Sequence, residues 1–420
     1  MFGTMLQSVR IPEIRKKLLF TAAMLALYRA GAYIPAPNID TNALSEIVKN
    51  QSAFGNGNVL QFLNLFSGGS LNRFAIFALG IMPYITASII LQLLQVVVPS
   101  LEKLRKEGEV GQQKITQYTR YLTVALAFAQ SIGYVFLFRT FTVGDAEIVK
   151  GGFTFSHVFV IVVTLTAGTI LLMWFGELIT QRGIGNGISL MIFASIASGL
   201  PNGIQAWWTN PDQIFKVMMP FIGLLVIAGI VFMQEGQRRI PVQYAKRVVG
   251  RRMSGGGSTY LPLRVNMAGV IPVIFAASLM ALPPTIGQLL GPGGFGQDFS
   301  NFFSPNGTAY IVGESVLIIV FTYFYTAVTF NPVEQADNLK KYGGFIPGVR
   351  PGRPTAEYLD RILARLTFPG ALYLAAVAAL PTILINQTSA NFFFGGTSIL
   401  IVVGVALDTV KQLEAQLMMR

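Results

Sequence analysis

The sequence predicts an all-α polytopic membrane protein with ten transmembrane helices in two inverted, pseudo-symmetric halves of five. Hydrophobic residues make up 52% of the 420 residues and charged residues only 12%, whereas soluble domains carry about 25% charged residues. The mean hydropathy is +0.56. The chain contains ten apolar runs of about the length that a membrane helix needs, roughly 20 residues. Basic residues are divided unevenly between the segments that join these runs.

The ten apolar runs predict the domain organisation. They lie at 18–34, 74–98, 119–138, 155–179, 184–207, 217–234, 267–290, 309–330, 368–386 and 392–410. Five runs precede the outer segment 208–216 and five follow it. An odd number of crossings in each half means that the halves cross in opposite senses, as inverted repeats do. We therefore expect an N-terminal half at 18–207, a C-terminal half at 217–410 and a tail at 411–420.

The distribution of Lys and Arg predicts that both termini are cytoplasmic. With the N-terminus placed inside, the inner segments hold 25 of the 31 basic residues and the outer segments hold 5, while Arg29 lies in the first span. Basic residues are retained on the cytoplasmic side of a membrane. Residues 1–17 combine Met5 and Val9 with four basic residues, which is typical of an amphipathic stretch on the membrane surface. They lack the apolar core of a signal peptide.

Two long inner loops, 235–266 and 331–367, are expected to be ordered. The first holds seven basic residues and alternates apolar with polar residues around IPVQYAKRVV. This pattern predicts a finger that resembles a β-hairpin, with its turn at 254–258 in SGGGS. The second loop combines Gly and Pro turns with a charged helical start, so it also presents side chains in a defined way.

The basic residues of these loops have two interpretations. Those close to the ends of spans satisfy the charge rule that orients the protein, and need no other role. Arg251, Arg252 and Arg350 lie at expected loop tips, far from the bilayer, where orientation does not require them. Exposed arginines at such tips suit an acidic partner, either ribosomal RNA or an acidic protein surface.

Few side chains in this sequence could catalyse a reaction or bind a metal. The chain has no cysteine, which excludes disulfides and cysteine-bound metal, and its one histidine, His157, has no evident partner for a metal or Ser-His site. Ionisable residues in or beside spans are Arg29, Glu177, Glu314 and Asp408, and each falls toward a span end. An uncharged membrane midplane argues against an ion-coupled transporter and an intramembrane protease. We expect no enzymatic activity, no metal and no cofactor.

Two isoleucine pairs suggest a constriction. Ile81 and Ile85, and likewise Ile188 and Ile192, are spaced i, i+4, which places each pair on one helix face. Stiff apolar side chains from the two halves could meet and close a pore by excluding water. Packed or lipid-facing isoleucines are common in spans, so spacing alone leaves ordinary packing open.

The second span is preceded by a broken apolar segment. Residues 60–72 are too few to cross a membrane, and Gly68 and Gly69 separate them from the helix that follows. The segment is expected on the outer side. By itself it is compatible with an ordinary re-entrant or interfacial turn.

Seven longer motifs follow one another along the chain. They are FSGGSLNRFAIFALGIMPYITASIILQLL, LRKEGEVGQQKITQYTRYLT, GELITQRGIGNGISLMIF, EGQRRIPVQYAKR, STYLPLRVNMAGVIP, FNPVEQADNLKKYGGFIPGVRPG and FFFGGTSILIVVGVALD. In this order they closely resemble the SecY family, the large subunit of the bacterial Sec protein translocase. The likeness begins near residue 10 and weakens only in outer loops. It implies two halves hinged at 208–216 around a central pore, with a plug and a lateral gate.

The resemblance also implies roles for individual residues. It places a ring of pore-sealing side chains at Ile81, Ile85, Ile188, Ile192, Ile274 and Ile401. It identifies 60–72 as the plug, with Phe62, Leu65, Phe66, Gly68, Gly69 and Leu71 as its functional residues. For the lateral gate, between spans two and three on one side and seven and eight on the other, we nominate Thr86 and Gln92. It assigns binding of the SecA motor or the ribosome to Lys246, Arg247, Arg251, Arg252 and Arg350.

The function implied is a protein-conducting channel in the bacterial inner membrane. It would pass unfolded preproteins outward and release signal sequences and membrane helices into lipid. SecE, SecG, the SecA ATPase and the ribosome are the expected partners. A secondary transporter and a flippase for lipids or peptidoglycan precursors remain as alternatives, although neither needs long basic loops.

Overall fold

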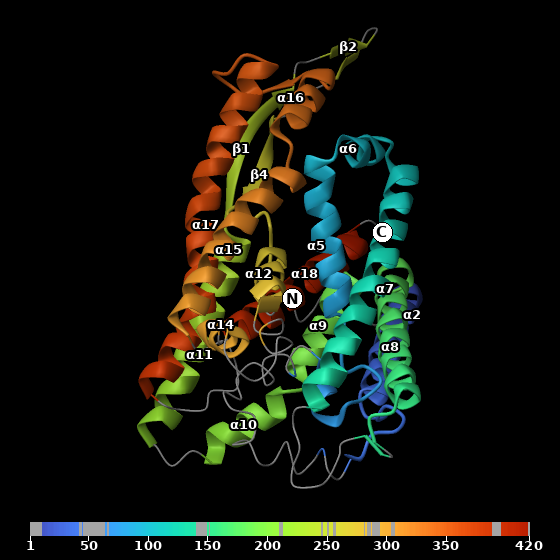
Figure 1. The fold of residues 1–420 in the computed structure, drawn as a ribbon. Helices are drawn as coiled ribbons and strands as arrows, with labels where there is room; N and C mark the ends of the chain where they lie inside the picture. Colours follow the sequence, from blue (N-terminus) through green and yellow to red (C-terminus); the bar gives the residue numbers. More distant parts are fainter. Residues whose placement is uncertain are drawn as a thin grey trace.

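The computed structural model describes residues 11–41, 44, 64, 67–139, 149–150, 152–209, 213–244, 247–249, 252–254, 258–280, 282–283, 287, 295–303, 307–388 and 396–418. The helices form two groups, one from each half of the chain (Figure 1). Helix α18 (Gly396–Met418) belongs to the second half but crosses to the first, where it contacts α9 (Gly187–Ala197). A small β-sheet lies at one end of the second group.

The first helix of the N-terminal group, α2, begins at Pro12, whereas the first predicted span begins at residue 18. The helices of this group are α2 (Pro12–Gly31), α5 (Met82–Val97), α6 (Pro99–Lys106), α7 (Glu109–Arg139), α8 (Phe155–Arg182), α9 and α10 (Leu200–Thr209). Proline is tolerated in the first turn of a helix, where its missing N–H has no partner to lose. Pro12, Pro83 and Pro99 accordingly open α2, α5 and α6. The Asn186 side chain caps α9 by accepting the N–H groups of Ile188 and Ser189.

The C-terminal group contains the longest helix that the structure describes. Its helices are α11 (Gln213–Glu235), α12 (Ile271–Met280), α14 (Phe295–Phe302), α15 (Thr308–Thr329), α16 (Pro332–Lys341), α17 (Arg353–Thr388) and α18. Asn331 caps α16, which begins the charged stretch of the second long loop. Helix α17 joins that loop to the ninth apolar run without a break, so the two are one continuous rod.

Among the described residues, four helical stretches are long and apolar enough to cross a membrane. They are Phe155–Arg182, Lys216–Glu235, Thr308–Lys341 and Arg353–Leu380. The pair α5 and α6 passes only if it is taken as one span, since it bends by 98°. Helices α9 and α12 are apolar but shorter. Each predicted run overlaps at least one helix, and the count of ten spans stays a prediction.

The predicted finger is a β-hairpin, but its turn is not where the glycines suggested. Strand β1 (Gln237–Tyr244) pairs antiparallel with β4 (Ser258–Arg264), and the shorter β2 (Arg247–Val249) pairs with β3 (Arg252–Ser254). The pairing of Val249 with Arg252 places the reversal between these two residues. Ser254 and Ser258 lie in strands, so the predicted turn at 254–258 is wrong. The register of β2 and β3, and not the SGGGS sequence, therefore marks where the finger reverses.

The second long loop is attached to the first. Strand β5 (Gly344–Phe345) adds to the free edge of β1, giving the strand order β4-β1-β5. A separate hydrophobic cluster lies beneath this sheet and includes Ile240, Val242, Ile346 and Leu359. Alternate residues of β1 therefore anchor both loops on the start of α17, and the loops form one platform.

The main core lies between the two helix groups, and glycine permits close approach at several points in it. A Cβ added at Gly168 of α8 would lie 2.1 Å from the carbonyl oxygen of Ile76. Nearby, Arg120 of α7 donates to both carboxylate oxygens of Glu177 in α8, at 2.9 and 2.6 Å. Glu177 is thus paired, in accord with its place toward a span end.

Gly168 and Gly223 of α11 give a matched test of this packing. We expect Gly168→Ala to lower the free energy of unfolding by about 1–3 kcal/mol, because the backbone of Ile76 must move. A Cβ at Gly223 would meet no heavy atom within 4 Å. Gly223→Ala should therefore leave stability unchanged or raise it by up to about 1 kcal/mol. Thermal unfolding in detergent measures both, and equal effects would contradict the close approach.

Candidate functional site: a dry constriction, a glycine hinge and a seam between the halves

The six predicted ring isoleucines come from four helices of both halves. Ile81 precedes α5 and Ile85 lies within it, α9 carries Ile188 and Ile192, α12 carries Ile274, and α18 carries Ile401. Five of them are members of the main hydrophobic cluster, and the partly buried Ile188 packs against it. All six therefore belong to, or pack against, the large hydrophobic core to which both halves contribute.

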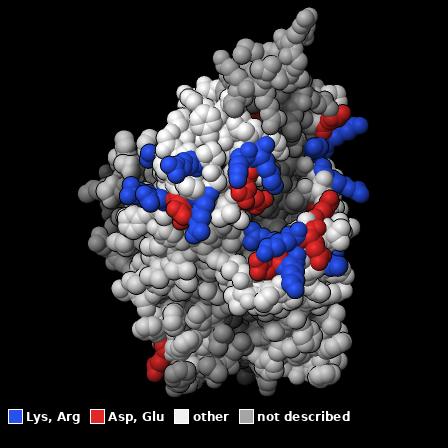
Figure 2. Space-filling view, turned by 90° about the horizontal axis from the view of Figure 1, so that it is seen from above, with Lys and Arg blue, Asp and Glu red and all other residues white. Residues whose placement is uncertain are grey.

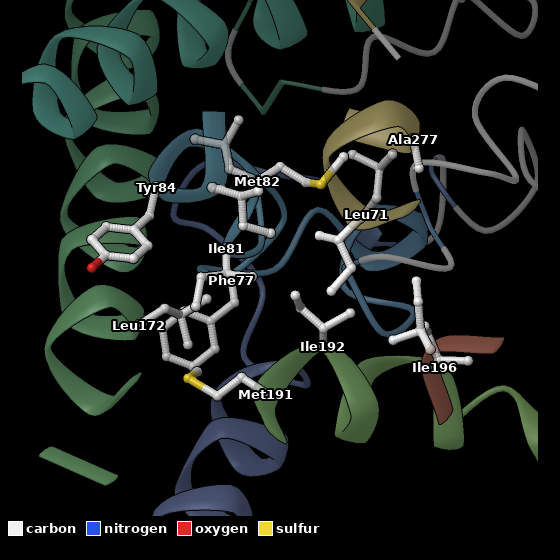
Figure 3. Packing of buried hydrophobic residues seen from close by; sticks show 14 of the residues in the cluster. Leu71, Phe77, Ile81, Met82, Tyr84, Leu172, Met191, Ile192, Ile196 and Ala277 are labelled. Atoms are coloured by element: carbon white, nitrogen blue, oxygen red, sulfur yellow. The ribbon is translucent and has the colours of Figure 1, made fainter. Parts of the chain in front are cut away.

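The cluster is tight on the side of α8. A Cβ at Gly176 would lie 3.5 Å from Cγ1 of Ile188 and 3.7 Å from Cδ1 of Ile81. Figure 3 shows Ile81 on the side of Met191 and Ile192, while the Met82 side chain extends toward Leu71 and toward Ala277 of α12. Isoleucine is branched at Cβ and restricted in χ1, and it offers no hydrogen bond. Contacts of this kind exclude water without binding any particular group.

The broken segment ends in a hinge that requires glycine. Gly68 and Gly69 have φ of 65° and 84°, in the left-handed region that favours glycine. Leu71, in the short turn Leu71–Arg73, is 1% exposed, and its side chain lies among Met82, Ile192 and Ala277 (Figure 3). Phe62, Leu65 and Phe66, the other predicted plug residues, lie outside the described residues.

Polar groups of α2 and α9 hold the backbone at the hinge. The Tyr28 hydroxyl lies 3.3 Å from the carbonyl oxygen of Ser67 and also hydrogen-bonds to the Ser195 hydroxyl. Arg29 donates from Nη1 to the carbonyl oxygen of Gly68 at 2.8 Å, and Ser198 donates to the same oxygen at 3.3 Å. Three side chains, those of Tyr28, Arg29 and Ser198, thus lie at the two hinge carbonyls, and Ser195 contacts the Tyr28 hydroxyl.

Sequence reasoning missed this set of donors, although it contained a signal. Arg29 is the one basic residue that the charge count leaves inside a span, and a buried or half-buried charge needs a partner. Arg29 and Arg73 also flank the ring of Tyr33, with guanidinium carbons 5.6 and 4.0 Å from its centroid.

The seam between α5 and α12 is the place where the resemblance puts the lateral gate. Thr86 is buried and donates to the carbonyl oxygen of Met82 at 3.0 Å, and Gln92 donates to Ser88 at 3.1 Å. Both bonds stay within α5. Across the seam, the Ser278 hydroxyl, which donates to the carbonyl oxygen of Ile274 at 2.7 Å, lies 3.7 Å from the sulfur of Met82. Ser278 follows Ile274 by one helical turn, a spacing that could have pointed to it.

A second contact crosses between the halves near the sheet. Nη2 of Arg105, in α6, donates to the carbonyl oxygen of Val328 at 2.8 Å. Val328 lies in the last turn of α15, where backbone carbonyls have no partner within the helix. A cation at this end also interacts favourably with the helix dipole. The bond therefore joins the end of α6, in the inner loop before the third predicted span, to the end of α15.

The predicted partner-binding residues lie on the platform of the two loops. Arg247 and Arg252 belong to β2 and β3, at the far end of the finger (Figure 1), whereas Lys246 and Arg251 lie outside the described residues. Arg350 is exposed between β5 and α17. Figure 2 shows Lys, Arg, Asp and Glu side chains gathered on this face around a hollow.

Comparisons with known proteins agree with this geometry. The family model SecY matches residues 75–410. The protein translocase subunit SecY of Mycobacterium bovis is 49% identical over 435 residues, covering 100% of this chain and 98% of the relative. Two solved channels share the fold. The structure of a protein conducting channel has a TM-score of 0.65 and 19% identity, covering 97% of this chain and 96% of its own. Sec61 in a canine ribosome–channel complex from the endoplasmic reticulum has a TM-score of 0.63 and 18% sequence identity, and the match covers 97% of this chain and 96% of that chain.

These relatives are translocase subunits and channels, so the expectation of a channel subunit and not an enzyme is confirmed. The predicted polytopic helical fold is confirmed as well, because fold and family agree along nearly the whole chain. The chain is therefore a member of the SecY family.

Proposed function

We propose that this chain forms the pore of a protein translocase, which passes unfolded polypeptides across the membrane and releases apolar helices sideways into lipid. The observation that carries the proposal is that five of the six isoleucines belong to the one core cluster to which both halves contribute, and that the sixth, Ile188, packs against it. A pore for polypeptides must accept every side chain while it retains ions. A ring without hydrogen-bonding groups suits both demands, because it parts around any sequence and closes by excluding water.

The broken segment acts as the plug in this proposal. Leu71 reaches the core that contains the ring isoleucines, and the hinge at Gly68 and Gly69 is held by Tyr28, Arg29 and Ser198. These three contacts end on two backbone carbonyls, so they can be released without unfolding a helix. Opening would break them as the segment moves away from α2 and α9.

The seam between α5 and α12 acts as the lateral gate. Thr86 and Gln92 keep their predicted role as polar residues of the gate, since both lie on α5. Ser278 and Arg105 join them, because each contacts a residue of the other half. Few polar bonds cross this seam among the described residues, which favours a boundary that can open without a large cost in unpaired groups.

Partners and orientation extend the proposal. The loop platform, with Lys246, Arg247, Arg251, Arg252 and Arg350, would face the cytoplasm and bind the SecA ATPase or ribosomal RNA of a translating ribosome. SecE and SecG would complete the channel in the inner membrane of a bacterium. Both termini would be cytoplasmic, and 208–216 would hinge the halves. The chain itself supplies no energy.

Reconstitution tests the function directly. Vesicles that contain this chain, SecE, SecA and ATP are expected to take up an unfolded secretory precursor, and failure of the wild type would contradict the proposal. Arg350→Glu should lower uptake severalfold because it reverses a charge on the motor-binding face. Arg361→Glu, which reverses an exposed charge on α17, is the matched control and should transport normally.

The ring is tested by ion conductance of the resting channel. We expect the double variant Ile81→Thr and Ile188→Thr to raise the leak severalfold, because hydroxyl groups let water enter the constriction. The same type of change at the exposed Ile227 of α11 should leave conductance unchanged. A tight resting channel in the double variant would remove these residues from the seal.

The hinge is tested at Arg29. A hydrogen bond from a charged group contributes about 1.5–3 kcal/mol, so its loss should raise the released fraction of the hinge roughly tenfold or more. We expect Arg29→Leu to increase the resting leak and Arg29→Lys to restore part of the seal. Arg73→Leu, which removes the other arginine on Tyr33, is the control. An equal leak in Arg29→Leu and Arg73→Leu would show that the loss of one positive charge near Tyr33, and not the hydrogen bond from Arg29 to Gly68, causes the leak.

A further inference from the structure

Helices α10 and α11 meet at the predicted outer hinge, the segment 208–216 that joins the two halves. Helix α10 ends at Thr209 and α11 begins at Gln213, at the end of the molecule opposite the β-sheet (Figure 1). In the described part of the chain, α11 packs extensively against α18 of its own half and against no helix of the N-terminal half. The direction in which α11 leaves the outer hinge therefore depends on local contacts.

Pro220 interrupts the hydrogen-bond ladder early in α11. In a regular α-helix, the carbonyl oxygen of residue 216 accepts the N–H of residue 220. Proline has no N–H, and its ring crowds the carbonyl group four residues before it. Because Pro220 lies inside this helix, the carbonyl oxygen of Lys216 lacks its usual donor.

Trp207 of α10 supplies a donor to this oxygen. Its indole Nε1 donates to the carbonyl oxygen of Lys216 at 3.1 Å. Indole has one N–H and no acceptor, and its N–H usually finds a partner when the ring is buried. The bond runs from the last residue of the predicted N-terminal half to the last residue of the predicted outer hinge. It therefore spans the outer hinge from end to end.

The neighbouring Trp208 is placed differently. It is 70% exposed, and its ring meets that of the half-buried Trp207 edge-on, with centroids 5.8 Å apart. Leu200 and Ile204 are exposed as well, and their i, i+4 spacing puts them on the same face of α10 as Trp208. Trp and apolar side chains at such a helix are typical of the membrane–water interface. The two adjacent rings thus separate an outward face from a bond across the outer hinge.

We propose that Trp207 is a positioning residue of the channel, whose indole N–H takes the place of the donor that Pro220 lacks and fixes the direction of α11 relative to α10. The inference rests on the proposed function, because it treats 208–216 as the hinge about which the lateral gate opens. Pro220 keeps the carbonyl oxygen of Lys216 out of the helix ladder. The bond across the outer hinge can therefore form and break while the ladder of α11 stays intact.

Distances between spin labels measure the angle between the halves. Because the chain has no cysteine, one thiol can be placed on each half, with Gln181→Cys on α8 and Val333→Cys on α16, both at exposed residues. Trp207→Phe keeps an aromatic ring and removes the N–H. In the full chain with SecE in lipid nanodiscs, the fraction of molecules outside the resting distance should rise roughly three- to tenfold, as expected for the loss of one hydrogen bond. Trp208→Phe is the matched control and should leave the distances unchanged.

Pro220→Ala provides a second arm. Alanine restores the N–H at residue 220, so the carbonyl oxygen of Lys216 regains a partner within α11. Combined with Pro220→Ala, Trp207→Phe should change the fraction by less than about twofold. A purely structural role of the indole ring predicts the same effect of Trp207→Phe with either residue at position 220. That result, or equal changes from Trp207→Phe and Trp208→Phe, would overturn the inference.

Uptake of a precursor by the wild type separates this inference from the proposed function. Unchanged label distances in Trp207→Phe, together with normal uptake by the wild type, overturn the role of Trp207 and leave the channel intact. A wild type that takes up no precursor, and whose label distances do not respond to SecA, ATP and precursor, overturns the channel together with the inference. A shift in Trp207→Phe that Pro220→Ala removes, in a chain that transports, supports both.

Discussion

In the proposed channel, a seal built only from dispersion contacts is the constraint on which the rest of the structure depends. The six isoleucines of the proposed ring lie in, or pack against, one hydrophobic core shared by both halves, and none of their side chains offers a hydrogen bond. Such a seal can open around any polypeptide, but it has no specific contact that would hold it closed. Its closure must therefore come from elements that position the helices carrying these isoleucines. The hinge, the seam and the loop platform supply the polar contacts that the ring lacks.

The polar contacts of the hinge and the seam can be broken without disturbing the hydrogen bonds inside any helix. Arg29, Tyr28 and Ser198 act on the carbonyls of Ser67 and Gly68, which the glycine pair has already freed from regular structure. At the seam, the Ser278 hydroxyl lies beside a methionine sulfur, which is a weak acceptor. The backbone hydrogen bonds within the helices do not have to break when these contacts are released. The structure thus separates what keeps the halves folded from what keeps them together.

Sequence patterns predicted the helices and the hairpin well, because hydrophobic periodicity and strand alternation act over neighbouring residues. The ring depended on the resemblance, since spacing within one helix cannot show which helices meet. Hinge donors were out of reach for the same reason: Tyr28 and Ser195 are 167 positions apart. The finger's turn was misplaced because SGGGS is the stronger glycine signal, whereas strand register places the reversal between Val249 and Arg252. Composition could not reveal that β5 completes the first loop's sheet.

The platform and the pore are connected through one short segment. Strand β4 ends at Arg264 and α12 begins at Ile271, so only the short link 265–270 separates the sheet from this helix. Helix α12 then carries Ile274 of the proposed ring and Ser278 beside the seam. Strand β5 ties the second loop to the same sheet. In the proposed channel, a partner that binds either loop would therefore act on the strand that leads into α12, and through this helix on the seal and the gate.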